Sequence, residues 1–147
     1  MKNHVMRSIA ILSLFFMLAI ASVNAQTPSR VEVNIPFDFS AGKATLKAGT
    51  YSIKRRSGNL LAISSVDGKT TALVNAPLTI GSRDSKAGER LVFNQYGSQY
   101  FLSQVWLSVD TGRQLFTSGA ETKAAREYKL ANNNANPKRV EIAMHAR

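Results

Sequence analysis

The sequence predicts an all-β domain, an antiparallel meander of about seven to eight strands that forms a small barrel or sandwich, with one short helix near the C-terminus. Three observations support this prediction. Apolar and polar residues alternate along much of the chain, turn sequences recur at the spacing of hairpins, and a helical period occurs once, late in the chain. Strands do not alternate with helices, so a parallel sheet is not expected.

The first strand is expected within "RVEVNIPFDF", residues 30–39, where every second residue is apolar. Its apolar side comprises Val31, Val33, Ile35, Phe37 and Phe39. Pro36 cannot donate a hydrogen bond to a neighbouring strand. We therefore expect this strand at a sheet edge or with a bulge at the proline.

Two short turns predict how the next three strands pair. Residues 57–59 form a three-residue loop, and Asp67-Gly68 is a strong two-residue hairpin signal. The expected pairs are Ile53 with Ile63, Ile63 with Ala72, and Leu61 with Val74. Both turns place the same side chains on one apolar face of the sheet. This face consists of Tyr51, Ile53, Leu61, Ile63, Ala72 and Val74.

A further hairpin is expected around Gly97-Ser98, after a polar, glycine-flanked surface loop at residues 81–88. The expected pairs are Phe93 with Leu102, Gln95 with Tyr100, Asn94 with Phe101, and Val92 with Ser103. Both faces of this hairpin mix apolar and polar residues, so the sequence does not say which face is buried.

The helix is expected after Phe116. Ser118 and Glu121 have the spacing of a capping box at a helix N-terminus. The stripe that would face inward consists of Ala120, Ala124, Tyr128 and Ala131. Residues 140–147 alternate again and predict a last strand, which could pair with the first and cover its edge.

The first 25 residues have the layout of a secretory signal peptide. A basic start is followed by an apolar run at residues 9–21, and small residues precede a cut at Gln26. This run is shorter than the ~20 residues of a membrane-spanning helix, although an uncleaved anchor is the alternative. We therefore expect residues 1–25 to be removed. Residues 26–147 then form a single β domain that is exported to the periplasm or the medium and has no membrane span.

The composition is basic and lacks cysteine. The chain has 19 Lys and Arg against 9 Asp and Glu, and the leader contains Lys2 and Arg7, so residues 26–147 keep a formal charge of +8. Such a surplus attracts polyanions, although it also suits a charged surface that keeps a secreted protein soluble. The candidate anion-binding residues are Lys54, Arg55, Arg56, Lys138 and Arg139, which would form one patch if these strand ends meet at a rim. Few aromatic residues lie near them, which argues against specific nucleic-acid binding.

Asp110-Thr111-Gly112 has the letters of an aspartic protease motif. Such enzymes need two carboxylates that share a proton, so a chain with one motif would have to act as a homodimer. The alternative is a hairpin turn, because Asp and Gly are ordinary turn residues. We favour the turn, which would join Val109 to Gln114 and set Leu107 opposite Phe116.

Other catalytic or metal-binding signals are weak. His145 is the one histidine after residue 25, and without cysteines it cannot build a dedicated zinc site unless several carboxylates join it. Glycoside hydrolysis needs two acids across a cleft, and no pair stands out in the sequence. We therefore expect no cofactor and no catalytic residue, although distant carboxylates could still be brought together by the fold.

The succession "VNIPFDF", "LKAGTYSI", "SSVDGK", "LVFNQYGSQYFLSQVW", "DTGRQL" and "SGAETKAARE" resembles a family of small uncharacterised secreted proteins of soil bacteria. Members begin with a signal peptide and continue with a Pro-Phe-x-Phe strand and a Pro-Ala-Gly-x-Tyr turn, in which Lys47 here replaces the first Pro. The resemblance implies export and a β fold. It implies no activity, ligand or catalytic residue.

The function expected from the sequence is a non-enzymatic exported module that binds a ligand or serves a structural role at the cell envelope or exterior. Its ligand could be a small amphipathic molecule inside the domain or an anionic envelope polymer on the basic exterior. One alternative is a carboxylate-dependent hydrolase whose site only the fold assembles. Another is a homodimeric aspartic protease that uses Asp110.

Overall fold

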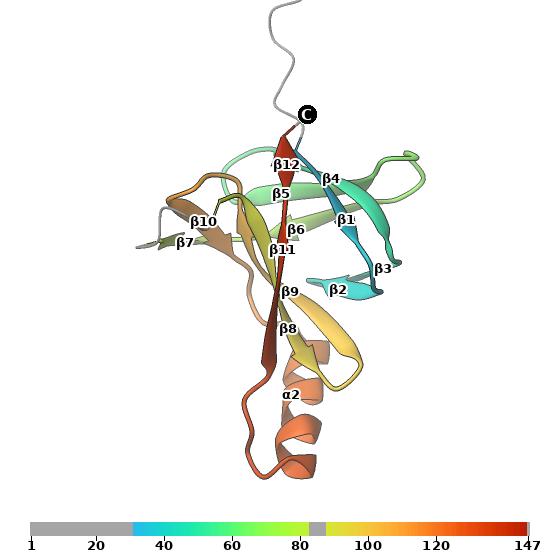
Figure 1. Cartoon of the computed structure of the whole chain (residues 1–147), viewed down its shortest axis with the longest axis vertical. Coiled ribbons are helices and arrows are strands. Elements are labelled where there is room, and N and C mark those ends of the chain that lie inside the picture. Colours follow the sequence, from blue (N-terminus) through green and yellow to red (C-terminus); the bar gives the residue numbers. More distant parts are fainter. Residues whose placement is uncertain (1–30, 83–87, 147) are drawn as a thin grey trace, which may run out of the picture.

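The computed structural model describes residues 31–82 and 88–146 (Figure 1). The predicted signal peptide, its cleavage site and most of the predicted loop at residues 81–88 lie outside these residues. In chain order the elements are β1 (Val31–Ile35), β2 (Phe39–Ala41), β3 (Ala44–Leu46), β4 (Gly49–Arg55), β5 (Leu60–Ser65), β6 (Thr71–Asn75), β7 (Leu78–Gly81), β8 (Arg90–Tyr96), β9 (Gln99–Trp106), β10 (Thr111–Gln114), α2 (Gly119–Ala131), β11 (Lys138–Ala143) and β12 (His145–Ala146).

The strands form two sheets. The first sheet has the order β12-β1-β4-β5-β6, and the second has the order β11-β8-β9-β10-β7, with β2 beside β9 and β3 beside β2. In Figure 1, β5 and β6 run across the view whereas β8 and β11 run along it, so strands of the two sheets cross steeply. The predicted all-β fold with one late helix is confirmed. Of the two expected forms, the described residues adopt the sandwich and do not close a barrel.

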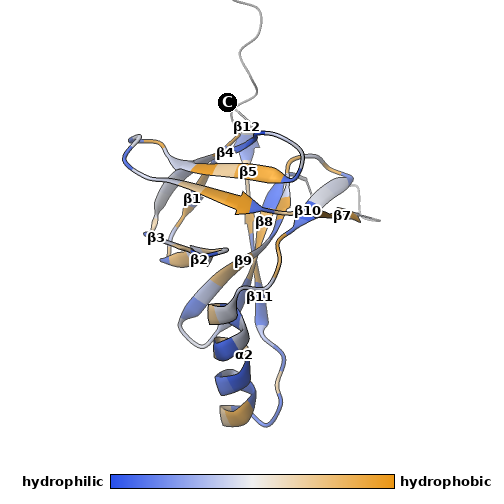
Figure 2. Ribbon diagram, turned by 180° about the vertical axis from the view of Figure 1, so that it is seen from behind, coloured by the Kyte–Doolittle hydropathy of each residue, from blue (hydrophilic) through white to orange (hydrophobic). Residues whose placement is uncertain are grey.

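The predicted apolar face of the first sheet is confirmed. Ile53 lies opposite Ile63, and Leu61 lies opposite Val74, as the two turns required. All six residues of this face are buried, and they share one core cluster with Phe93 and other residues of the second sheet. In Figure 2, hydrophobic residues predominate along β5 of the first sheet and hydrophilic residues along most of α2. Side chains from both sheets therefore fill the space between them.

The segment predicted as one strand at residues 30–39 forms two strands. Strand β1 ends at Ile35, directly before Pro36, and β2 begins at Phe39. β1 lies between β12 and β4, so the proline lies beyond the strand end and not within an edge strand. The alternation of burial nevertheless continues across the break: Phe39 is buried, and the half-buried Phe37 stacks on Tyr100 with ring centroids 3.8 Å apart.

Two continuous segments connect the sheets at their edges. β6 ends one edge of the first sheet, β7 ends one edge of the second, and Ala76 and Pro77 join them. At the opposite edges, Met144 joins β11 of the second sheet to β12 of the first. Ala76 and Met144 are both buried, as expected where a strand bends from one sheet into the other. The predicted last strand is therefore divided, but its predicted pairing with the first strand is confirmed by Glu32 opposite His145.

The predicted register of the Gly97-Ser98 hairpin is confirmed near the turn, but farther from the turn the register is shifted by one residue. Phe93 lies opposite Leu102 as predicted, but a bulge follows, and Val92 lies opposite Gln104 in place of the predicted Ser103. Ser103 is the extra residue, and its carbonyl accepts the N–H of Leu115 at 2.9 Å. The bulge therefore ties β9 to the segment that follows β10.

Helix α2 begins as predicted but presents a different face. Ser118 Oγ accepts the N–H of Glu121 at 3.1 Å. In place of completing the capping box, Glu121 Oε1 accepts the side-chain amide of Asn94 at 2.9 Å and the hydroxyl of Tyr96 at 3.4 Å, both on β8. Figure 1 shows that α2 extends beyond the end of the sheet, so only part of it is covered. Within the predicted stripe Ala124 is buried and Tyr128 half-buried, whereas Ala120 and Ala131 are exposed, which corrects the prediction.

Candidate anion-binding site

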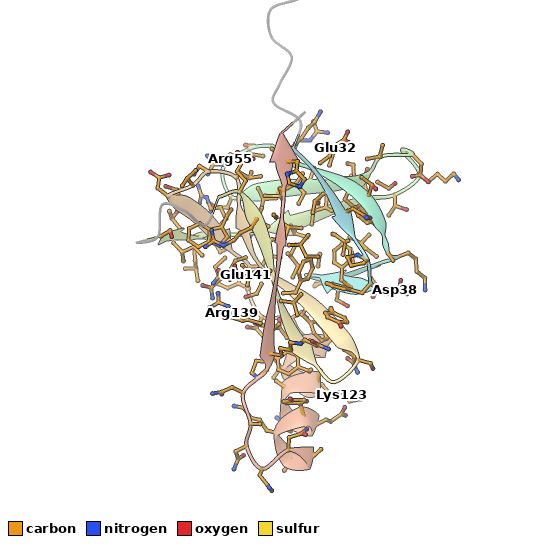
Figure 3. The ribbon with its side chains drawn as sticks, in the orientation of Figure 1. Glu32, Asp38, Arg55, Lys123, Arg139 and Glu141 are labelled. Carbon is orange, nitrogen blue, oxygen red and sulfur yellow. The ribbon has the colours of Figure 1, made fainter. Side chains whose placement is uncertain are left out.

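The structure divides the predicted basic residues into two groups. Lys54 and Arg55 end β4 in the first sheet, and Arg56 follows them in the turn. Lys138 and Arg139 begin β11 in the second sheet, opposite Gln95 and Asn94. Figure 3 shows Arg55 and Arg139 well apart. The five residues are brought together within each group but not at a single rim.

Arg55 shares a pocket with an arginine that the sequence analysis did not select. The pocket has a volume of about 370 Å³. It is lined by Arg55, Val105, Leu107, Ser108, Thr111 and Arg113. We call it the two-arginine pocket. Its lining contains two cationic side chains and no carboxylate.

Strand geometry explains why these arginines meet. Residues two apart on a strand share a face, so Arg55 projects from the same face as the buried Ile53. Arg113 lies directly opposite the buried Val105 across the β9–β10 pair, which places both on one face of the second sheet. Both arginines therefore stand where the apolar interior ends and the space between the sheets opens.

Arg113 also connects the two sheets. Its Nη1 donates to the side-chain oxygen of Asn59 at 3.1 Å, and Asn59 belongs to the turn between β4 and β5. Its Nε is buried and has no hydrogen-bond partner among the described residues. The guanidinium is thus held in place on one side while one of its N–H groups is left without an acceptor.

Of the Asp110-Thr111-Gly112 segment, Thr111 lines this pocket. A β9–β10 hairpin is confirmed here, but its register differs from the prediction, since Gly112 lies opposite Trp106 and Gln114 opposite Gln104. Ser108 Oγ accepts the N–H of Thr111 at 3.2 Å and donates to Asp110 Oδ1 at 3.1 Å, which stabilises a longer loop than the predicted one. Asp110 is exposed and accepts a second hydroxyl from Thr111 at 3.2 Å. It acts as a loop-stabilising residue.

The close approach of Gly112 to Trp106 supports this register. A Cβ atom at Gly112 would lie 2.5 Å from Cδ2 of the indole, so only glycine fits at this position. The guanidinium carbon of Arg90 lies 4.3 Å from the centroid of the same ring, within the range of a cation–π contact. Arg90 Nε is also 3.4 Å from Glu141 Oε2, so this arginine already has an aromatic and an anionic neighbour.

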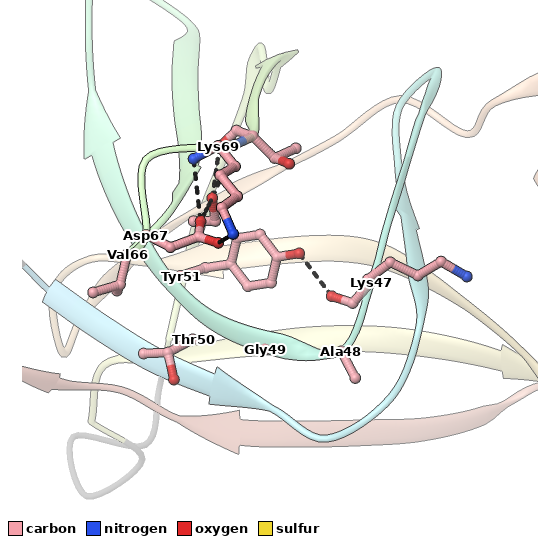
Figure 4. Close-up of a pocket in the computed structure, with 10 residues that line it drawn as sticks. Lys47, Ala48, Gly49, Thr50, Tyr51, Val66, Asp67 and Lys69 are labelled. Carbon is pink, nitrogen blue, oxygen red and sulfur yellow. Dashed lines mark hydrogen bonds and ion pairs between the residues drawn. The ribbon is translucent and has the colours of Figure 1, made fainter.

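A second pocket, of about 550 Å³, lies beside Tyr51 (Figure 4). It is lined by residues 47–51, 65–67, 69 and 70. The hydroxyl of Tyr51 donates to the carbonyl of Lys47 at 2.7 Å, and Lys69 Nζ lies 3.6 Å from Asp67 Oδ2. Lys47 Nζ in turn donates to Asp38 Oδ2 at 2.8 Å. Unlike the arginines of the first pocket, both lysines here are paired with carboxylates.

The titration of these groups argues against acid catalysis at the second pocket. The hydrogen bond from Lys47, followed by that from the Ala48 N–H, lowers the pKa of Asp38 below its ordinary value of 3.8. Hydrogen bonds from the Ser65 hydroxyl and the Lys69 N–H lower the pKa of Asp67 in the same way. Burial, with the charges of Asp38 and Asp67, raises the pKa of the Tyr51 hydroxyl. A general acid needs a raised carboxyl pKa, and both acids here are shifted in the opposite direction.

Comparison with protein-family models, curated proteins and solved structures found no match.

The remaining sequence candidates lie outside both pockets. His145 is exposed on β12, opposite Glu32. In residues 31–82 and 88–146, no three His, Asp or Glu side chains gather closely enough to hold a metal ion. Over the same residues, no helix has the length and apolar character needed to cross a membrane.

Proposed function

We propose that this protein is a non-enzymatic module, exported to the periplasm or the medium, that binds an anionic polymer of the cell envelope or exterior. One observation carries the proposal: all five predicted basic side chains are without a hydrogen bond or ion pair among the described residues. They are Lys54, Arg55, Arg56, Lys138 and Arg139. Their charges are therefore available to an external partner.

The acidic residues, in contrast, are largely engaged within the molecule. Four of them form ion pairs: Asp38 with Lys47, Asp67 with Lys69, Glu127 with Lys123, and Glu141 with Arg90. Intramolecular pairing reduces the repulsion that free carboxylates would exert on a polyanion. The two basic groups therefore keep positive charge that no carboxylate of the described residues neutralises.

The separation of the two groups suits an extended ligand. A small anion can contact only one of them, whereas a flexible polymer can contact both at once. The two contacts on one ligand then increase the overall affinity. A polysaccharide with acidic residues at intervals has the required chemistry. The sequence resemblance to secreted proteins and the leader at residues 1–25 support an exterior location for such a ligand.

The alternatives receive less support. The space between the sheets is occupied by the core side chains, so the proposal places the ligand on the exterior. The acids beside the second pocket are paired with lysines and have lowered pKa values, which does not favour a hydrolase. Asp110 accepts two hydroxyl groups in a loop, which does not favour a protease.

Retention on immobilised heparin tests the proposal. The protein, expressed with its own leader and recovered from the exported fraction, should begin at Gln26 and bind heparin at low salt. Retention should fall steeply as salt rises beyond about 0.1 M, because the Debye length there is only ~10 Å. Binding to vesicles of anionic lipid but not to heparin, or to neither, would contradict the polysaccharide proposal.

Charge-removing variants locate the contact. Replacing Arg55 and Arg56 by Gln, or Lys138 and Arg139 by Gln, should lower the salt concentration at which heparin releases the protein. The matched control replaces Arg126 and Lys129 of α2 by Gln and removes the same number of charges. An equal loss in this control would indicate diffuse attraction without the proposed contact groups.

A further inference from the structure

We infer that the two-arginine pocket binds one carboxylate, sulfate or phosphate group of a small organic anion or of an acidic sugar residue. This inference deepens the proposed function. It rests on that function only where the acidic group belongs to a polymer, and not where the ligand is a free small anion. The inference stands on the pocket itself, where two arginines from opposite sheets, Arg55 and Arg113, line a volume of about 370 Å³.

The charge of the pocket is the first argument. Arg55 has no ion pair among the described residues, and Arg113 has one hydrogen bond, to the neutral side chain of Asn59. Two like charges that share a pocket repel each other, and an anion between them offsets this repulsion. The lining includes no Asp or Glu to supply that charge from within. An external oxyanion would supply it.

The unpaired Nε of Arg113 is the second argument. A buried N–H group without an acceptor is costly, and one on a charged group more so. The guanidinium is a planar set of donors that matches the two oxygens of a carboxylate or the edge of a phosphate. Asn59 holds only Nη1, and Nε is buried without an acceptor, so an oxyanion that reached Nε would satisfy it once the guanidinium turned toward the pocket.

The remaining walls indicate what the acidic group is attached to. Ser108 and Thr111 contribute hydroxyl groups, and Val105 and Leu107 contribute apolar surface. Both hydroxyls donate to Asp110 Oδ1, so toward the pocket they offer oxygen atoms that can accept hydrogen bonds from sugar hydroxyls. Asp110 itself does not line the pocket, whereas both arginines do. The volume lies within the usual range for small-molecule sites, about 300–1,000 Å³. A single sugar acid or a small organic acid fits this combination.

Nuclear magnetic resonance titration with inorganic phosphate, and separately with galacturonate, tests the site. At constant ionic strength each probe should cause saturable shifts of the Ser108 and Thr111 amides. The Nε–H signal of Arg113 should shift in parallel, since its protection from solvent makes it observable. Changes that never saturate, or that spread evenly over all basic residues, would overturn the inference.

Two variants and one control separate the site from general charge. Arg55→Gln should weaken binding of both probes about tenfold, because a charge-assisted contact is lost. Arg113→Lys keeps the charge but removes Nε and the planar donor set, and should weaken binding by a similar factor. Arg56→Gln removes the neighbouring charge, which does not line the pocket, and should change affinity by less than about twofold. An equal effect of Arg56→Gln and Arg55→Gln would refute the site.

The outcomes for the site and for the proposed function are distinguishable. If galacturonate at saturation releases the protein from heparin, the pocket accepts an acidic group of the polymer. If phosphate and galacturonate bind saturably while heparin is never retained, the site stands for a free anion and the proposed function fails. If heparin is retained but neither probe saturates, the polymer proposal stands and this site is refuted.

Discussion

At the scale of single residues, Gly112 shows how a position can be determined by one neighbour. Its Cα lies against the face of the Trp106 indole, whose other neighbour is the guanidinium of Arg90. The φ angle of Gly112 is not in the left-handed region, so the need for glycine here is steric and not conformational. The contact brings β10 close to β9 and so positions Arg113 in the two-arginine pocket.

Gly112→Ala should therefore lower the free energy of unfolding by about 1–3 kcal/mol, because the added methyl group must displace the indole ring. Urea denaturation followed by Trp106 fluorescence measures the change. Gly81→Ala is the matched control, since Gly81 lies on the adjacent strand β7, has a negative φ and has open space where its Cβ would lie. It should be neutral or slightly stabilising. A Gly112→Ala protein as stable as this control would contradict the stacking role.

Asp38 is a second single residue with a testable effect, because its ionisation makes the stability of the fold depend on pH. Its pKa is lowered in the folded state, chiefly by the hydrogen bond from Lys47. A carboxyl group with a lowered folded pKa stabilises the fold above its unfolded pKa, and this contribution disappears as the pH falls through the folded value. Unfolding measured between about pH 5 and about pH 2 should therefore show a smaller loss of stability in Asp38→Asn than in the wild type.

In Asp38→Asn, the dependence of stability on pH that remains reports on the other carboxylates. Asp67 is shifted in the same direction by Ser65 and Lys69, so the double variant Asp38→Asn/Asp67→Asn should be flatter still. Curves for the wild type and the double variant that run parallel below pH 4 would show that neither carboxylate contributes.

At the scale of elements, short hairpins were predictable and longer connections were not. The turns at residues 57–59, 67–68 and 97–98 each specify a register through the number of residues they contain, and the structure has these registers next to the turns. The bulge at Ser103 depends on the hydrogen bond that its carbonyl accepts from Leu115, and the loop before Thr111 depends on the one that Ser108 Oγ accepts from the Thr111 N–H. Local patterns do not show either bond. Arg55 could be selected from its charge. Arg113 could be selected only once the β9–β10 register placed it opposite Val105.

Helix α2 illustrates a second limit of the pattern. Its apolar period suggested contact through small residues, yet the side that meets β8 carries the buried carboxylate of Glu121. Burial and this nearby charge raise the pKa of the Tyr96 hydroxyl, which donates to the same oxygen atom. The helix is thus attached largely by polar contacts, together with the edge-on pair of Tyr96 and Tyr128 rings.

Glu121→Ala should release α2 from the sheet at a cost of about 1–3 kcal/mol, because the amide of Asn94 loses its acceptor in a half-buried position. Amide hydrogen exchange should accelerate throughout Gly119–Ala131 while exchange in β4 and β5 stays unchanged. Glu127→Ala removes an exposed acid from the same helix, where the ion pair with Lys123 spans 3.9 Å, and should have little effect. Equal acceleration in both variants would contradict the role assigned to Glu121.

At the scale of the whole molecule, the chain itself joins the two sheets at edges where, among the described residues, no backbone hydrogen bonds pair one sheet with the other. The edge strands of the first sheet are β12 and β6, and the chain joins them to β11 and β7 of the second sheet at Met144 and at Ala76-Pro77 (Figure 1). Exposed edges invite pairing with other chains, and a bend into the second sheet shortens the free edge at each of these points. The sequence predicted the contact between the last and first strands, but not that the same segment also pairs with β8 through Glu141 and Ile142.

Met144 stabilises the second of these bends, where the chain passes from β11 of the second sheet into β12 of the first. Its side chain is 5% exposed, its N–H donates to the carbonyl of Glu89 at 2.9 Å, and the strand on either side belongs to a different sheet. Met144→Ala should lower the free energy of unfolding by about 2–5 kcal/mol, because the buried side chain leaves a cavity between the sheets. Met144→Leu conserves volume and should cost less than about 1.5 kcal/mol.

The bend at Met144 also predicts that the two variants differ in the protection of β1 and in their tendency to associate. Loss of packing at Met144 should free β12 from β1 and expose the edge of β1, so Met144→Ala should show faster hydrogen exchange at Val31 and Val33 and concentration-dependent association by analytical ultracentrifugation. Met144→Leu should remain monodisperse to the same extent as the wild type. If the alanine variant is destabilised but β1 keeps its protection, β12 is held by its pairing with β1 alone, and the sheets are not joined through this residue.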